Sequence, residues 1–468
     1  MYEDLADLSI KYVSKLGANY AEARLEHRVG NSFVLKNGIL EGSEIGVVQG
    51  IGIRFIVNKT LGFISLNEFK KEKIKEIVSK AIRLTKYSSR IKEPISLADT
   101  EILSRKYKVK QKINLNNISH AQKINELFEI EKEIKSKNVP ARIFLLSDVL
   151  TKKYFVNSED IKIMAEIPQV DIFYFVTVKE GIKSIQRSWH YGESRGWECF
   201  KEWNLKEKIK QEVKILQKNL LYGKKSPKGK MDVVVGPEIT GIMVHESAGH
   251  PYEADRIMGR EAAQAGESFV TKDMIGTKIG SSVVNVVDDP TILNSYGFYL
   301  YDDEGVKARR KYLVKDGKIN ELLHNRETAF KMGLSSNGSA RACDFDVEAI
   351  VRMSNTFMLP GDYTEDEIIQ DTKHGVYIKN FMEWNIDDLR FNQKYVGCEA
   401  YLIKNGEIKN PVRNPIIEIT TPKLYSSIDA LTKKVEFHAA ECGKGEPMQG
   451  IPVWMGGPTI RLKNIVIK

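Results

Sequence analysis

The segment His245-Glu246-Ser247-Ala248-Gly249-His250 limits the possible folds of this chain more than any other, because its two histidines stand five positions apart. A strand-like run and a proline precede it, and proline is favoured in the first turn of a helix, so we expect a helix over about 238–250. Five residues of an ideal helix turn through about 500°, so the two imidazoles would diverge by about 140°. They can face a common point only if the helix is deformed, and a π-bulge would deform it sufficiently. Gly249 and the following Pro251 both favour such a departure from a regular helix.

The same segment carries groups that commonly bind and use a metal ion. Two imidazoles are frequent zinc ligands, and a glutamate beside one of them can act as a general base on a zinc-bound water. A chance match of the pattern is the alternative. A catalytic zinc needs a third protein ligand, and the candidates are Cys442, His438, His374, His324, Glu253 and Asp255. A lone cysteine is more often a small buried apolar residue than a ligand, so spacing alone leaves the third ligand open.

Hydrophobic periodicity and turn signals indicate an α+β chain, in which small N-terminal α/β units precede a strand-rich domain that carries the HExxxH helix. We expect three domains: an N-terminal α+β domain over residues 1–90, a middle α+β domain over 91–223 and a strand-rich C-terminal domain over 224–468. The last boundary depends on the polar, basic segment Lys224-Lys225-Ser226-Pro227-Lys228-Gly229-Lys230.

Local signals place individual elements within the first two domains. Asn37-Gly38 is a strong hairpin signal, and Ser119 is a favourable helix N-cap. A helix is expected over about 205–221. The expected strands cover 20–28, 32–36, 39–45, 141–148, 153–157, 161–167, 171–178 and 183–190.

Charge and cysteine content argue against several other classes of protein. The net charge is +9, but most lysines lie beside glutamates on helix faces without interleaved aromatic residues, so we expect no nucleic-acid binding. No run of 18 apolar residues exists, and the acidic N-terminus lacks the features of a secretory signal, so we expect no membrane association. Four widely spaced cysteines without a CxxC pair favour a cytoplasmic location.

Besides the histidine segment, several short motifs stand in a fixed order along the chain. They are Ala21-Glu22-Ala23-Arg24, Gly50-Ile51-Gly52-Ile53-Arg54, Val287-Asp288-Asp289-Pro290-Thr291, Tyr301-Asp302-Asp303-Glu304-Gly305, Ser336-Asn337-Gly338-Ser339-Ala340-Arg341, Arg352-Met353-Ser354-Asn355-Thr356, Glu399-Ala400-Tyr401-Leu402-Ile403, Cys442-Gly443-Lys444 and Gly457-Pro458-Thr459-Ile460-Arg461. In this combination the chain resembles the TldD/PmbA family, and its TldD branch in particular, since the PmbA-like branch lacks HExxxH.

The resemblance implies a zinc-dependent metallopeptidase that hydrolyses unstructured peptides. It assigns His245, His250 and Cys442 as the zinc ligands and Glu246 as the general base on a zinc-bound water. It also implies assembly, either as a homodimer or as a heterodimer with a PmbA-like subunit. A non-catalytic, partner-binding or regulatory subunit on the same scaffold is the alternative, which an intact Glu246 disfavours.

Two segments depart from the family pattern where a substrate groove is expected. Residues 382–387 replace a glycine-rich GGGQVD-like stretch, and residues 452–459 replace a PVGVGxPT-like ending. Arg341 and Asn355 are candidate substrate-binding groups near this groove. We expect Asp302-Asp303-Glu304-Gly305 to form a structured turn, because three consecutive acids do not supply the alternating oxygens of a calcium loop.

Overall fold

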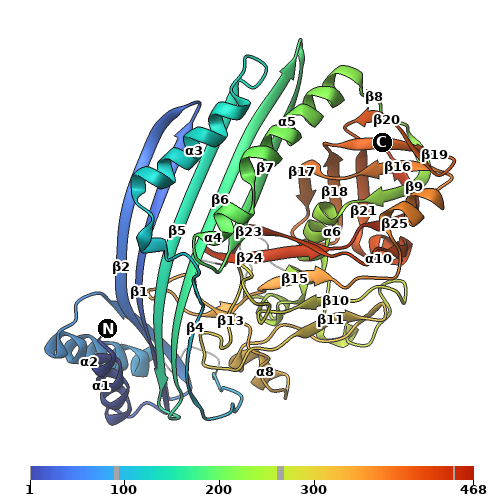
Figure 1. Cartoon of the computed structure of the whole chain (residues 1–468). Helices are drawn as coiled ribbons and strands as arrows, with labels where there is room; N and C mark the ends of the chain where they lie inside the picture. Colours follow the sequence, from blue (N-terminus) through green and yellow to red (C-terminus); the bar gives the residue numbers. More distant parts are fainter. Residues whose placement is uncertain (1, 89–93, 261–267, 446–447) are drawn as a thin grey trace.

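The protein consists of a long curved sheet and a C-terminal half built from shorter sheets (Figure 1). The computed structural model describes residues 2–88, 94–260, 268–445 and 448–468. Both halves contain helices and strands, and the HExxxH segment continues a helix of the second half. The predicted α+β class is therefore confirmed.

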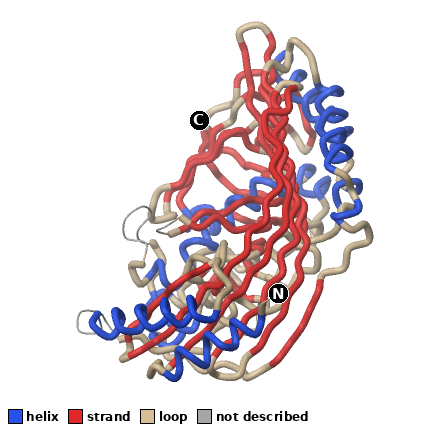
Figure 2. Tube along the Cα trace, turned by 90° about the vertical axis from the view of Figure 1, so that its left-hand side faces the viewer, coloured by secondary structure: helices blue, strands red, loops and turns tan. Residues whose placement is uncertain are grey.

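Seven strands form the long sheet, in the order β3-β2-β1-β5-β6-β4, with β7 also paired to β6. Their bounds are β1 Tyr20–Lys36, β2 Ile39–Val57, β3 Thr60–Leu66, β4 Ser104–Lys108, β5 Ala141–Asn157, β6 Lys162–Glu180 and β7 Lys183–Glu193. Figure 2 shows these strands running along most of the molecule. β1 turns into β2 at Asn37 and Gly38, whose φ angles are 50° and 81°. Both are positive, as the predicted hairpin turn requires.

Several strands of this sheet are longer than the sequence predicts. The runs 20–28 and 32–36 form the single strand β1, and the four runs between 141 and 178 form only β5 and β6. Pro168 lies inside β6, between the residues that pair with β4 and those that pair with β7. A proline lacks the N–H that a second neighbouring strand would need. It is tolerated there because β6 changes partners at that point.

Amphipathic helices pack against this sheet (Figure 1). α1 Glu3–Lys15 and α2 Lys71–Ser88 pack near the N-terminal end of β1 and against β3. α3 His120–Ile134, α4 Glu198–Glu202 and α5 Leu205–Tyr222 share an apolar core with β5 and β6. The Ser119 side chain accepts a hydrogen bond from the Gln122 N–H in a capping box. The predicted N-cap and the predicted helix over 205–221 are thus confirmed.

The C-terminal half contains one large sheet, one six-stranded sheet and a two-stranded ribbon. The large sheet runs β17-β18-β21-β25-β9-β16-β19-β20-β8, with β22 paired to β25; the six-stranded sheet runs β12-β11-β10-β15-β24-β23. The bounds are β8 Lys224–Lys225, β9 Gly229–Val235, β10 Val286–Asp288, β11 Lys311–Lys315, β12 Lys318–Ile319, β13 Ala340–Arg341, β14 Ile350–Val351, β15 Asn355–Met358, β16 His374–Ile378, β17 Phe381–Ile386, β18 Asn392–Gly397, β19 Ala400–Lys404, β20 Glu407–Arg413, β21 Ile416–Thr420, β22 Ile428–Leu431, β23 Glu436–Lys444, β24 Gln449–Gly457 and β25 Ile460–Ile467. The α-helices in the described part of this half are α6 Pro237–Val244, α7 Ala254–Ile257, α8 Arg326–Lys331, α9 Glu365–Gln370 and α10 Thr421–Ser427.

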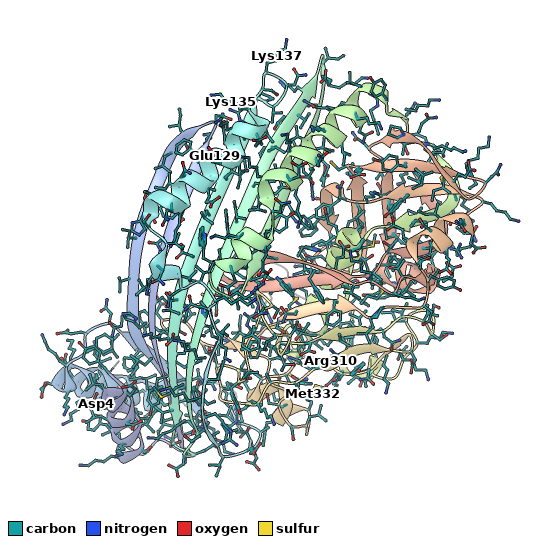
Figure 3. All side chains as sticks on the ribbon, viewed as in Figure 1. Asp4, Glu129, Lys135, Lys137, Arg310 and Met332 are labelled. Carbon is teal, nitrogen blue, oxygen red and sulfur yellow. The ribbon has the colours of Figure 1, made fainter. Side chains whose placement is uncertain are left out.

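A buried group of charges joins the two halves. Arg54 on β2 lies 2.9 Å from Glu22 on β1 and 2.6 Å from Glu304 of the C-terminal half, and all three side chains are buried. In Figure 3 the labelled Glu129 on α3 and Arg310 near β11 mark the two halves, with side chains filling the space between them. Since buried charges need partners, these pairs fix the position of one half relative to the other.

The turn that supplies Glu304 is organised by its own carboxylates. Asp302 accepts hydrogen bonds from the N–H groups of Val306 and Ala340. Asp303 lies 3.0 Å from Lys153 on β5. The expected structured turn is therefore confirmed, and its residues Asp303 and Glu304 contact the long sheet.

Gly50 and Gly52 on β2 allow the two halves to approach closely. A Cβ on Gly50 would come within 2.1 Å of the Phe345 ring, and one on Gly52 within 2.1 Å of its carbonyl oxygen. A larger residue at Gly52 would therefore clash with the backbone of the C-terminal half.

The division into three domains stays a prediction. The expected boundary near residue 90 falls in residues 89–93, which lie outside the described residues. Strands from both expected N-terminal domains pair directly, as β1 with β5. None of the described helices is long and apolar enough to cross a membrane.

Replacing Arg54 by alanine should strongly destabilise the protein, because Glu22 and Glu304 would stay buried and lose their ion-pair partner. We expect a loss of about 3–5 kcal/mol, seen as a lower midpoint of thermal unfolding. Lys73→Ala is the matched control, since it removes an exposed pair with Glu76 and should change stability by less than about 1 kcal/mol. Equal effects of the two substitutions would contradict this role of Arg54.

Candidate metal centre

The helix that carries the two histidines is deformed where the sequence predicts. α6 follows β9 directly, and after Val244 the backbone forms a π-helical turn over His245–Gly249. The rings of His245 and His250 then lie 5.1 Å apart, centroid to centroid, at an interplanar angle of 82°. The extra residue in this turn removes the divergence that five positions would produce on a regular helix.

Gly249 is the last residue of the π-helical turn. Its φ is −74°, which any residue can adopt. A Cβ at this position would instead lie 2.5 Å from the Met353 sulfur. The glycine therefore lets Met353 pack closely beneath the turn.

Cys442 reaches this site from β23. Its sulfur lies 3.3 Å from His250 Nε2. One donor atom from each of His245, His250 and Cys442 lies within 4.8 Å of the other two, and all three residues are buried. The structure therefore brings together the three residues that the resemblance assigns as zinc ligands.

The other candidates for the third ligand occupy different places. The His438 ring lies against Trp189 in a tilted arrangement, with ring centroids 4.6 Å apart. His324 makes a hydrogen bond to Thr328, and His374 is exposed at the start of β16. None of these histidines joins the His-His-Cys cluster found among the described residues.

Glu253 contacts His250 and Lys444, and Asp255 contacts Lys444; both contacted residues belong to the segments that carry the ligands. Glu253 Oε2 lies 3.2 Å from His250 Nδ1 and 3.2 Å from Lys444 Nζ. Lys444 also lies 2.6 Å from Asp255. Carboxylates that bind the second nitrogen of a ligand histidine fix its ring orientation. The lysine of the Cys442-Gly443-Lys444 motif therefore links the cysteine strand to the histidine segment.

Burial and neighbouring charges favour the metal-binding forms of the three side chains. Burial lowers the pKa of His245 and that of His250, which favours neutral imidazoles. Burial alone would raise the pKa of the Cys442 thiol, but the His250 ring and the Arg352 guanidinium outweigh it, so the net pKa is lowered. Neutral imidazole and thiolate are the forms that bind metals.

This donor set fits a zinc ion. Two imidazoles and one thiolate match the three protein ligands of catalytic zinc sites, which keep a fourth position open. His245 Nδ1 is buried and has no hydrogen-bond partner among the described residues. The residues present are therefore suited to zinc in both type and number.

Glu246 lies beside the cluster without belonging to it. Its side chain is buried, and its Oε2 accepts a hydrogen bond of 2.7 Å from Arg390. Arg390 stands in the turn between β17 and β18, 144 positions away in the sequence. No local pattern in the sequence marks this arginine, so sequence reasoning missed it.

The two candidate substrate-binding residues make protein contacts. Arg341 donates hydrogen bonds to the carbonyl groups of Met353 and Pro452, and it lines a cavity of about 430 Å³ between the two halves. Asn355 is fully buried, and its amide donates to the Asp289 carbonyl and to Ser295. A substrate contact stays a prediction for both.

The chain is similar to known proteins over its whole length. Residues 228–468 match the family model of the PmbA/TldA metallopeptidase C-terminal domain, and residues 21–85 match that of domain 1. A metalloprotease of Methanocaldococcus jannaschii is 31% identical over 461 residues, covering 97% of this chain and 98% of the relative. A zinc metalloprotease TldD homolog of Saccharolobus solfataricus is 26% identical, covering 98% of each chain. The crystal structure of TldE from Thermococcus kodakarensis superimposes with a TM-score of 0.74 at 18% identity, covering 99% of each chain, which shows a shared fold.

Exchanging the third ligand should remove the metal. We expect about one zinc per chain in the purified protein and far less in Cys442→Ser, because a hydroxyl is a much poorer ligand than a thiolate at neutral pH. His438→Ala is the control, since that histidine lies on the same strand outside the cluster. This variant should keep its zinc. Elemental analysis of both variants decides the assignment. Full zinc in Cys442→Ser with loss in His438→Ala would show that the wrong residue is assigned.

Proposed function

This chain belongs to the PmbA/TldD metallopeptidase family, and from that premise we propose that it is a zinc-dependent peptidase that hydrolyses unstructured peptides. The observation that carries the proposal is the buried cluster of His245, His250 and Cys442 with Glu246 beside it. His245, His250 and Cys442 would hold the zinc ion. Bound there, it would polarise the substrate carbonyl and lower the pKa of a water.

Glu246 is proposed as the general base. Its Oε2 is held by Arg390, which leaves Oε1 to accept a proton from the attacking water. The same oxygen can then donate that proton to the nitrogen of the leaving amine. A purely structural metal site would need no such base, so Glu246 favours catalysis over the regulatory alternative.

The substrate is proposed to bind as an extended strand. β17 is the end strand of the large sheet and pairs only with β18 among the described residues. Glu383, Trp384 and Asn385 on this strand are exposed, and its C-terminal end leads into the turn that carries Arg390. A free sheet edge offers backbone hydrogen bonds to an extended peptide, whereas a folded protein has no free strand to add.

Assembly with a second subunit is part of the proposal. The partner is either a second copy or a PmbA-like chain. The similarity to TldE supports a shared scaffold for two such subunits, and two-fold symmetric pairs are the most common oligomers.

Glu246→Gln should keep the zinc and lose at least about 100-fold in peptide cleavage, because glutamine retains the shape but cannot accept the proton. Mass spectrometry of an unstructured peptide digest, together with elemental analysis, measures both. Wild-type cleavage by Glu246→Gln would exclude Glu246 as the base.

Removing zinc with a chelator should abolish cleavage while the protein stays folded, because a chain of this size buries enough core to fold without a metal. Circular dichroism of the chelated protein checks the fold, and added zinc should restore cleavage. Cooperative unfolding on chelation would indicate a structural site instead.

The active protein should be a dimer in solution. Light scattering of a sample with full peptidase activity should give about twice the mass of one chain. A strictly monomeric mass for that sample would contradict the proposed assembly.

A further inference from the structure

The guanidinium of Arg390 lies against the proposed base inside the protein. Its Nη1 donates a hydrogen bond of 2.7 Å to Glu246 Oε2, and the arginine side chain is only 15% exposed. Its Nε is buried and has no hydrogen-bond partner among the described residues. The arginine thus makes one strong contact, and that contact is to Glu246.

The backbone holds Arg390 in an unfavourable conformation. Its φ is +64°, in the left-handed region that disfavours residues with a Cβ. The Arg390 N–H donates to the Asp387 carbonyl, and the Thr421 hydroxyl donates to the Arg390 carbonyl. Asp387 also accepts hydrogen bonds from Phe391 N–H and the Asn392 amide. Several contacts therefore maintain a turn in which glycine would be less strained.

A side chain kept at a strained position suggests that its function compensates for the strain. The turn itself needs no guanidinium, because its hydrogen bonds use the backbone and the side chains of Asp387 and Thr421. Among the described residues, the Arg390 side chain makes its one hydrogen bond and ion pair with Glu246.

We propose that Arg390 is a positioning residue, which holds one carboxylate oxygen of Glu246 so that the base acts through the other. This inference rests on the proposed function, in which Glu246 takes a proton from the attacking water. A single well-oriented hydrogen bond between charged groups fixes the rotation of a carboxylate. Misplacement of a reacting group by about 1 Å can reduce a rate about 100-fold.

Arg390→Gly tests this role without endangering the fold, because glycine adopts a φ of +64° freely. We expect kcat to fall about 10- to 100-fold, while KM changes less than about twofold and the zinc content is retained. Arg390→Lys keeps the charge and should recover part of kcat. Added guanidinium ions, at concentrations far below those that denature, should partly restore kcat in Arg390→Gly.

Lys59→Gly is the matched control. Lys59 is exposed, has a φ of +58° and lies in the β2–β3 turn, far along the sequence from the site. This variant relieves the same kind of strain and should keep wild-type kcat, with no response to guanidinium. An equal loss of kcat in both variants would overturn the proposal, because the loss would then follow from the backbone alone.

The metal-free protein offers a readout that is independent of catalysis. Thermal unfolding of Arg390→Gly, Glu246→Gln and the double variant forms a double-mutant cycle, and we expect a non-additive change because the two residues are in contact. Additive changes would show that the pair does not interact and would overturn the proposal.

The two proposals fail in different ways. Cleavage by Glu246→Gln would reject Glu246 as the base. An inactive Glu246→Gln together with a fully active Arg390→Gly would reject only the positioning role. A raised KM with unchanged kcat in Arg390→Gly would also reject that role and would show that the arginine contacts the substrate.

Discussion

The metal centre depends on one buried carboxylate, that of Glu253. It is fully buried, so its charge must be matched by neighbours. His250 Nδ1 and Lys444 Nζ each lie 3.2 Å from the same oxygen, and the net effect of these neighbours is a lowered pKa despite burial. Because Lys444 lies two residues after Cys442, this one carboxylate orients the ring of one ligand and anchors the strand that supplies another.

The long sheet also contacts the helix and the strands that carry the metal centre. Arg187 on β7 makes two hydrogen bonds, of 2.7 and 2.8 Å, to Glu238 in the first turn of α6. The Trp454 indole on β24 donates to the Gly192 carbonyl on β7. Together with the pairs of Arg54, these contacts hold the helix and the strands of the metal centre at one position on the long sheet.

One of the two segments expected to depart from the family pattern lies close to Glu246 in the fold. Residues 382–387 contain most of β17 and the beginning of its turn, at the place where the resemblance implies a glycine-rich stretch. Three of these residues are exposed on the edge strand, and the following turn brings Arg390 to Glu246. The edge strand proposed to bind the substrate and the proposed base are therefore linked through this one turn.

Local sequence signals determined the features whose causes act within a few residues. The Asn37-Gly38 turn, the Ser119 cap and the deformation between His245 and His250 were all predictable, because each depends on backbone geometry over six residues or fewer. The strands β5 and β6 were not predicted at full length, since pairing with distant neighbours outweighed local turn signals. Cys442 came only from the family resemblance, because its contact with His250 spans 192 positions. Arg390 had no signal at all: its approach to Glu246 results from the packing of the β17–β18 turn against the π-helical segment, which only the tertiary structure decided.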